Sequence, residues 1–349
     1  MKSISLGCVA WVAIVLCTVP AYAQYSVDGY ADFWAVASTT RPADGQRAWS
    51  TQPWRTNTMA VNLVTVGLRY ADSTKRGRVA LQEGTFPQVN YVNADAAWRW
   101  IGEATVGVHI GNNTWIDAGI MPSHIGFESA RPSANVTLTR SLIADFTPYY
   151  EAGVKVSHTT TGGLQFGILV LQGWQQIVDV NDDPAIGTLL SIPISDGVSL
   201  QWNTYGGNEA PRGLPTAIRL HSNLTLQAAV SESLVMAFLF DATIQRLPTV
   251  ERATMLYGGL QVRHTISNTC SMGYRIEYAS DRDGVLFVTN VADGFQTASG
   301  SINLDVAIAE NVQWRTEARA FSANNPVFPS RDGNKTADLL VCSALAVSF

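Results

Sequence analysis

The sequence predicts an all-β protein, a transmembrane antiparallel up-and-down β-barrel of about 16 strands within a range of roughly 14 to 18. Three observations predict it. Polar and apolar residues alternate in segments throughout residues 24–349. The connections between these segments are short and long in strict alternation along the chain. An export signal precedes these segments, yet none of them approaches the roughly 18 apolar residues that a transmembrane helix needs.

The N-terminal segment has the pattern of a secretory signal peptide. Lys2 supplies the positive charge, residues 4–19 are mostly apolar, and the small-x-small sequence Ala21-Tyr22-Ala23 precedes Gln24. An N-terminal membrane anchor is the alternative, but the apolar run is short and ends at Pro20. We therefore expect a signal peptide over residues 1–23 and an outer-membrane β-barrel over residues 24–349.

Composition restricts which cellular compartment and which partners the protein can have. Charged residues make up 15% of the chain, and without Lys2 the 22 basic residues face 28 acidic ones, a formal charge of −6. This acidic balance argues against nucleic acid as a partner. An exported, weakly charged chain without strong helical patterns points to the outer membrane of a Gram-negative cell.

Cys270 and Cys342 fall on opposite faces of non-neighbouring strands, so we expect free thiols. No Cys/His cluster has metal-site spacing, and no cofactor is expected.

The strands follow from period-two alternation. The clearest example is "EAGVKVSH", in which Glu151, Gly153 and Lys155 alternate with apolar neighbours. The segment "GVLFVTN" at 284–290 could add a further hairpin arm, which gives the range in strand number. In order, strands are expected at 25–37, 57–71, 77–90, 98–110, 113–121, 146–158, 163–175, 187–194, 197–206, 217–230, 233–245, 252–266, 270–280, 296–309, 312–322 and 337–349.

The connections indicate how these strands are arranged. The short ones are "DSTKRG", "GNN", "TTTGG", "SDG", "SES", "SNT" and "EN". The long ones lie near 38–56, 91–97, 122–145, 176–186, 207–216, 246–251, 281–295 and 323–336. Every short turn therefore falls at one end of the strands, which is typical of an outer-membrane barrel and not of a soluble sandwich. The polar face then lines the lumen, and the apolar face meets lipid.

The last strand, "LLVCSALAVSF" at 339–349, has large apolar residues on one face. In hydrocarbon every backbone group must be paired, so we expect this strand to close on the first one. Its pattern is similar to the signal that barrel-assembly machinery recognises, carried by Val341, Leu345, Val347 and Phe349.

Residues 78–157 contain motifs that resemble a known family. The most telling are "LQEGTF", "IGEATVG", "WIDAGIMPSHIGFESA", "LTRSL" and "PYYEAGVK". They resemble the beta-barrel porin family described as OmpL-like. The similarity continues through "LVLQGWQQI" towards the C-terminus, whereas the segment before Thr56 matches poorly. The resemblance implies an outer-membrane barrel that conducts small solutes.

The longest connection, Pro122 to Asp145, is the candidate pore constriction, because a long loop in a compact fold is usually functional. We expect it to fold into the barrel, where charged groups would set selectivity. Arg140 facing Glu128 or Asp145 would create a transverse field; alternatively, Arg140 and Glu128 pair and only fix the loop to the wall. The candidate constriction residues are His124, Glu128, Arg131, Arg140 and Asp145.

Charged residues on the neighbouring strands are expected to face the lumen, because an Arg or Lys in the lipid midplane costs about 2–4 kcal/mol. They would stiffen the wall through salt bridges or line an ion path. These lumen-wall candidates are Arg99, Glu103, Asp117, Glu151 and Lys155. Aromatic residues near strand ends are expected to form interfacial girdles, while Trp49 and Trp54 in the first long loop are candidates for ligand contact.

The expected function is that of a porin, allowing passive diffusion of small hydrophilic solutes or ions through a loop-constricted pore. The expected surroundings are outer-membrane lipid. The sequence leaves the oligomeric state open; a homotrimer, which is common among sixteen-stranded porins, is one of the states that it allows. Two alternatives remain: a plugged barrel acting as an adhesin or structural anchor, and a barrel hydrolase. The hydrolase is disfavoured because Ser123 lies in a loop without the sharp turn of a hydrolase nucleophile. His124 and Glu128 offer two metal ligands without a third.

Overall fold

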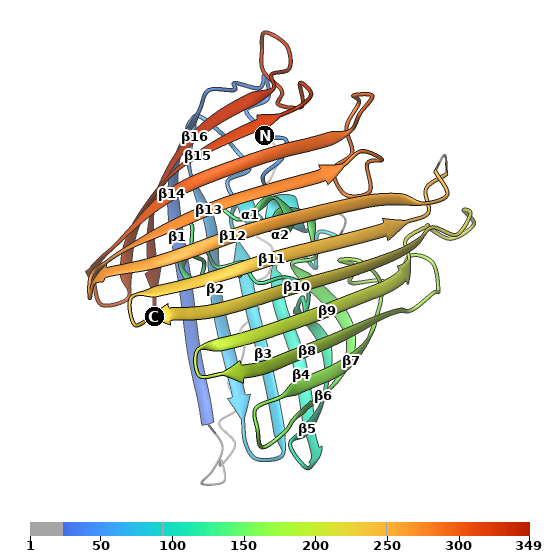
Figure 1. Ribbon diagram of the computed structural model, residues 1–349. Coiled ribbons are helices and arrows are strands. Elements are labelled where there is room, and N and C mark those ends of the chain that lie inside the picture. Colours follow the sequence, from blue (N-terminus) through green and yellow to red (C-terminus); the bar gives the residue numbers. More distant parts are fainter. Residues whose placement is uncertain (1–23, 93, 249) are drawn as a thin grey trace, which may run out of the picture.

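The computed structural model describes residues 24–92, 94–248 and 250–349, so the expected signal peptide lies outside the described residues. Sixteen antiparallel strands form a closed barrel in which each strand pairs with its neighbours in sequence and β1 pairs with β16 (Figure 1). The strands are β1 (Gln24–Ser38), β2 (Thr58–Ala71), β3 (Lys75–Glu83), β4 (Ile101–Gly111), β5 (Thr114–Pro122), β6 (Tyr150–Thr159), β7 (Gln165–Leu171), β8 (Ala185–Ser195), β9 (Val198–Asn208), β10 (Ile218–Ser231), β11 (Leu234–Gln245), β12 (Ala253–Ser267), β13 (Cys270–Asp281), β14 (Phe295–Ala309), β15 (Val312–Ala323) and β16 (Ala337–Ser348).

The predicted fold class and strand number are confirmed, but three strands are clearly shorter than expected. The strand expected over 163–175 ends at Leu171, and the one expected over 146–158 starts only at Tyr150. The strand expected over 77–90 ends at Glu83, and Thr85–Asn90 forms helix α1 instead. Gly84 has a φ of 127°, and Pro87 has no N–H to donate to a sheet, so the ladder stops there. The segment 284–290 adds no strand; its amides at Val285 and Phe287 donate to the Asp281 carboxylate.

All short turns lie at one end of the barrel, where Figure 1 also places the C-terminus. The turn at Asn112 and Asn113 has positive φ at both residues, 49° and 54°, as a two-residue hairpin turn requires. At the seam, Gly29 and Phe349 exchange backbone hydrogen bonds of 2.8 and 3.1 Å. The Phe349 ring lies against Gly29, where any Cβ atom would come within 2.1 Å of it.

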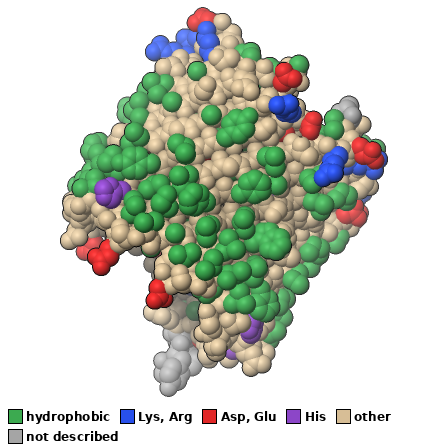
Figure 2. All heavy atoms as spheres, viewed as in Figure 1, with side chains coloured by type: hydrophobic (Ala, Val, Ile, Leu, Met, Phe, Trp, Pro, Cys, Tyr) green, Lys and Arg blue, Asp and Glu red, His purple; other side chains and the backbone are tan. Residues whose placement is uncertain are grey.

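The outer face of the wall is apolar. Figure 2 shows apolar side chains spread over the strands, with charged side chains gathered towards the rims. Phe238, Phe240, Leu256 and Ile276 are among the exposed apolar residues. None of the helices in the described part of the chain has the length and apolar character of a transmembrane span.

Long connections fold inward and pack against one side of the barrel. These are L1 (39–57), L3 (123–149), L7 (282–294) and L8 (324–336). In this cluster Trp49 of L1 contacts Phe295, with ring centroids 4.9 Å apart, and Phe287 of L7 at 6.2 Å. Trp49 also donates to the Val327 carbonyl at 2.6 Å. The lumen is thereby filled beside β11–β16.

Candidate pore constriction

L3 leaves β5 and crosses the lumen before it enters β6, and its first residues are held by the wall. His124 Nδ1 lies 2.8 Å from a carboxylate oxygen of Glu151, and Nε2 lies 2.8 Å from the Thr204 carbonyl. Gly187 on β8 leaves room for this ring, because a Cβ atom there would come within 2.7 Å of it. Ser123 donates to the same Glu151 carboxylate at 3.0 Å.

The middle of L3 is fixed to β13–β15 through a buried set of charges. Glu317 accepts from the Thr139 amide at 2.5 Å and from its hydroxyl at 2.8 Å. Glu277 accepts from the Leu142 amide at 2.8 Å, next to the start of helix α2 (Leu142–Phe146). Arg275 donates to Glu317 at 3.0 Å, and Arg319 donates to Glu277. All four charged side chains are at most 1% exposed, so each has its counter-charge inside the protein.

A third arginine holds the preceding stretch of L3. Arg315 pairs with Asp305, Nε to Oδ1 at 2.5 Å, and donates to the carbonyls of Pro132 and Asn135. Pro132–Ala134 is a 3-10 helix in L3. L3 therefore contacts the wall continuously from residue 132 to residue 142.

The expected pairing of Arg140 with the Glu128 carboxylate is wrong. That carboxylate accepts from the amide and hydroxyl of Ser141 at 2.8 and 2.6 Å and from Gln261 at 2.8 Å. Arg140 instead donates to the Glu128 carbonyl at 3.3 Å and lies over the Tyr149 ring at 3.9 Å. The physical reason is the helix start at Ser141, whose free donors take the carboxylate.

Asp145 joins L3 to L1. It accepts from Thr51, amide at 3.1 Å and hydroxyl at 2.8 Å, and from the Tyr149 hydroxyl at 2.8 Å. Burial raises the pKa of the Asp145 carboxyl, and the Arg140 charge opposes this effect only in part. Burial likewise raises the pKa of the Tyr149 hydroxyl well above its usual range.

Partly exposed charges lie where L3 faces β1–β4. Arg131 lies 2.5 Å from Asp28 and donates to the Thr65 hydroxyl at 3.0 Å. Arg78 binds both oxygens of Asp28, at 2.5 and 2.9 Å, and reaches Glu103 at 2.9 Å. Two arginines and two carboxylates thus meet across the gap between L3 and the wall.

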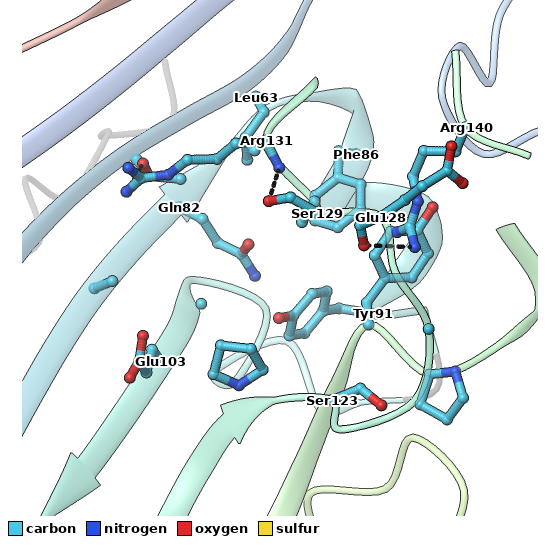
Figure 3. A pocket seen from close by; sticks show the side chains of 18 of the residues that line it. Leu63, Gln82, Phe86, Tyr91, Glu103, Ser123, Glu128, Ser129, Arg131 and Arg140 are labelled. Carbon is cyan, nitrogen blue, oxygen red and sulfur yellow. Dashed lines mark hydrogen bonds between the residues drawn. The ribbon is translucent and has the colours of Figure 1, made fainter. Parts of the chain in front are cut away.

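This gap is a cavity of about 370 Å³ (Figure 3). Figure 3 shows Gln82, Tyr91, Glu103 and Arg131 around it, with Arg140 and Glu128 on its loop side. A second cavity, of about 530 Å³, shares Arg78, Glu103 and Pro122 with the first. A third, of about 560 Å³, shares Arg76, Trp115 and Lys155 with the second. Because neighbouring cavities share lining residues, the three adjoin in series along the inner face of β2–β8, opposite the filled side; we call this series the wall path.

The candidate residues divide into three groups. Glu128, Arg131 and Arg140 line the first cavity, whereas His124 and Asp145 anchor L3. Glu103, Asp117 and Lys155 line the wall path, and Glu151 is buried at the His124 anchor.

The sequence predicted that Arg99 projects into the lumen from a wall strand, and this prediction is wrong. Arg99 precedes β4 and donates to the carbonyls of Val92 at 3.2 Å and Ala94 at 3.4 Å. The reason is that β4 starts only at Ile101. Asp28, Arg76 and Arg78 were not among the predicted wall residues, although alternation through "KRGRVALQE" would have placed Arg76 and Arg78 on the face of Ala80.

The two tryptophans of L1 lie in different surroundings. Trp49 packs inside the barrel among the loops and is therefore a poor candidate for ligand contact, whereas Trp54 is partly exposed, with the Arg55 guanidinium over its ring at 4.8 Å. Cys270 and Cys342 are free thiols, as predicted. Within the described residues, no group of three or more His, Cys, Asp or Glu side chains could hold a metal ion.

A family model described as "Putative beta-barrel porin-2, OmpL-like" matches residues 24–349. No curated protein sequence matches the chain significantly. Among solved structures, an anion-selective porin from Comamonas acidovorans superposes with a TM-score of 0.64 at 9% identity, covering 94% of this chain and 100% of that one. The outer membrane channel DcaP of Acinetobacter baumannii gives 0.64 at 12% identity, covering 95% and 99%. The trimer form of OmpT from Vibrio cholerae gives 0.57 at 7% identity, covering 93% and 99%. At these identities the likeness concerns the fold.

Proposed function

The chain belongs to the OmpL-like family of beta-barrel porins and is an outer-membrane porin, and we propose that its solutes cross along the wall path between L3 and β2–β8. The observation that carries this proposal is the series of adjoining cavities, of about 370, 530 and 560 Å³, on that side of the lumen. Sixteen strands leave an aqueous channel unless loops fill it. Here loops fill one side and leave the other open.

The constriction lies where L3 approaches β1–β4. Arg131 supplies the loop side of the gap, and Arg78 and Glu103 supply the wall side. Glu128 and Arg140 complete the loop side, whereas His124 and Asp145 position the loop. We propose that solute size is limited by this gap and that charged solutes interact first with Arg131, Arg78 and Glu103.

A plugged barrel is the second candidate function, and one observation favours it. L1, L3, L7 and L8 form a single apolar cluster inside the barrel, with Trp49, Phe287 and Phe295 in mutual contact. A barrel filled further than this would serve as an anchor or adhesin. For the hydrolase, the Ser123 hydroxyl donates to Glu151, and among the described residues no histidine hydrogen-bonds to it, so Ser123 does not form a nucleophile–base pair.

We also propose a homotrimer in the outer-membrane lipid, with the outer face of β14–β16 and β1 as the interface. Small residues on this face, Ala35, Ala298, Ala318 and Ala320, are exposed. Thr316 and Ser343 form a polar pair at 2.9 Å on the same face. Small and hydroxyl-bearing residues favour close contact between protein surfaces within a membrane.

The proposed pore is tested by reconstitution of the refolded protein. Liposomes containing it should swell in solutions of small sugars and more slowly in solutions of larger ones, and planar bilayers should show stable conductance steps. Folding is checked beforehand by the shift in gel mobility on heating. Folded protein that neither conducts nor admits sugars would contradict the pore and favour the plugged barrel.

A further inference from the structure

The wall path carries more cationic than anionic groups. Asp28 is shared by two arginines, Arg78 and Arg131. Asp117 is shared by Arg76, whose Nε and Nη2 lie 2.6 and 2.5 Å from it, and by Lys155 at 3.8 Å. Glu103 pairs with Arg78, which already binds Asp28. These three carboxylates are therefore matched by four cations. Glu128 and Arg140, which also line the first cavity, add one charge of each sign.

Arg69 adds a further cation. It lies directly opposite Arg78 in the register of β2 and β3, is exposed, and lines the second cavity. Among the described residues, no acidic side chain lies within ion-pair distance of Arg69. Two like charges placed directly opposite each other across a sheet destabilise it. Wall stiffening by salt bridges therefore does not account for Arg69.

The exposed parts of these groups are also mainly cationic. Arg76, Arg131 and Lys155 side chains are 38%, 32% and 27% exposed, whereas Glu103 and Asp117 are 19% and 8% exposed. Asp28 is 31% exposed but lies between its two arginines. Asp72, at the turn end of the path, has its carboxylate occupied by the Tyr70 hydroxyl and the amides of Thr74 and Lys75.

From this imbalance we propose that the wall path prefers anions, and that Arg69, Arg76 and Lys155 form a weak binding site for small solutes carrying an oxyanion such as phosphate. This inference rests on the proposed pore. Exposed guanidinium and ammonium donors match the oxygens of carboxylates and phosphates. The chain as a whole is acidic, with a formal charge of −5, so the preference comes from the local arrangement. In water, one charge about 7 Å from a passing ion changes its local concentration about two- to threefold.

The test is the reversal potential of reconstituted protein under a potassium chloride gradient. The wild type should pass chloride more readily than potassium. The Arg69→Gln and Lys155→Gln single variants should each lower the chloride-to-potassium permeability ratio by about twofold. Inorganic phosphate should reduce the chloride current of the wild type, and this reduction should weaken in both variants.

Arg212→Gln is the matched control. Arg212 pairs with Asp182 on the outer loops, where both side chains are about two-thirds exposed. The chloride-to-potassium permeability ratio of Arg212→Gln should equal that of the wild type. Conductance steps with a cation preference, or a ratio that Arg69→Gln and Lys155→Gln leave unchanged, would overturn the anion preference while the pore stands. Folded protein without any conductance would overturn the pore and the preference together.

Discussion

Thr139 and Glu317 lie 178 residues apart, yet the Glu317 carboxylate accepts hydrogen bonds from both the amide and the hydroxyl of Thr139. Glu317 belongs to the wall, and Thr139 belongs to the loop that crosses the lumen. The same carboxylate pairs with Arg275 at 3.0 Å. The contact therefore joins L3 to a charge network of the wall and helps to hold the loop against β13–β15.

Removing the Glu317 carboxylate should release the middle of L3. Glu317→Ala leaves the Arg275 charge and the Thr139 amide without their partner, which costs about 3–5 kcal/mol for a buried pair. We expect a lower free energy of unfolding in urea and larger fluctuations of the open-channel current. Glu310→Ala, at the exposed turn between β14 and β15, is the control and should stay within about 0.5 kcal/mol of the wild type. Equal effects of the two substitutions would show that L3 does not depend on Glu317.

The Gly187 site tests the other anchor of L3. Gly187→Ala places a Cβ atom within 2.7 Å of the His124 ring, so the ring must leave the Glu151 carboxylate or the strand must shift. Overpacking of this kind costs about 1–3 kcal/mol. We expect lower stability in urea and a changed conductance step. Gly258→Ala, where no heavy atom lies within 4 Å of the added Cβ, should change neither.

Asp145 should make stability depend on pH. Its pKa in the folded protein is raised above 3.8 by burial, so the unfolded chain loses this proton at a lower pH than the folded one. The stabilisation by the protonated side chain is complete below the unfolded pKa and is lost as the pH rises through the folded pKa. Asp145→Asn, which keeps an acceptor for Thr51, should flatten the decline in unfolding free energy just above pH 3.8. Asp332→Asn, at an exposed position of L8, should leave this decline unchanged; a flattening in that variant too would contradict the assignment.

Phe349 should act in assembly more than in stability. Its ring is 69% exposed and covers Gly29, so its removal deletes little buried surface. If Val341, Leu345, Val347 and Phe349 form the assembly signal, Phe349→Ser should lower the folded fraction in the outer membrane of producing cells. Refolded Phe349→Ser should unfold at nearly the wild-type urea concentration. Ser348→Ala is the control for expression. A normal folded fraction for Phe349→Ser would exclude the signal.

Much of the barrel could be predicted because each strand carries its own signal. Alternation in β6 and β13 reflects a wall with lipid on one side and the lumen on the other, and this local contrast fixes both the strand and its inner face. The error at Thr85–Asn90 arose where a helix with Pro87 follows a strand without a change in apolar content.

The site could be predicted only in part. Charge and loop length identified Arg131 and Glu128 as residues near the gap. The sequence does not indicate, however, which strands of the barrel wall L3 packs against. Arg140 and Glu128 suggested a pair because they are close in sequence. The actual partners of Glu128 are Ser141, at a helix start, and Gln261, on β12, and only the folded loop brings them together.

The central claim is that solutes follow the β2–β8 side of the lumen while L3, together with L1, L7 and L8, fills the other side. It is tested by single-channel recording with an anionic thiol reagent. Two matched substitutions are made in a Cys270→Ser background, in which Cys342 remains fully buried. Ser157→Cys places a thiol on β6 in the third cavity, and Ser301→Cys places one on β14, where Ser301 is 6% exposed. We predict that 2-sulfonatoethyl methanethiosulfonate lowers the conductance of Ser157→Cys and leaves that of Ser301→Cys unchanged. A drop in Ser301→Cys, or none in Ser157→Cys, would contradict the account.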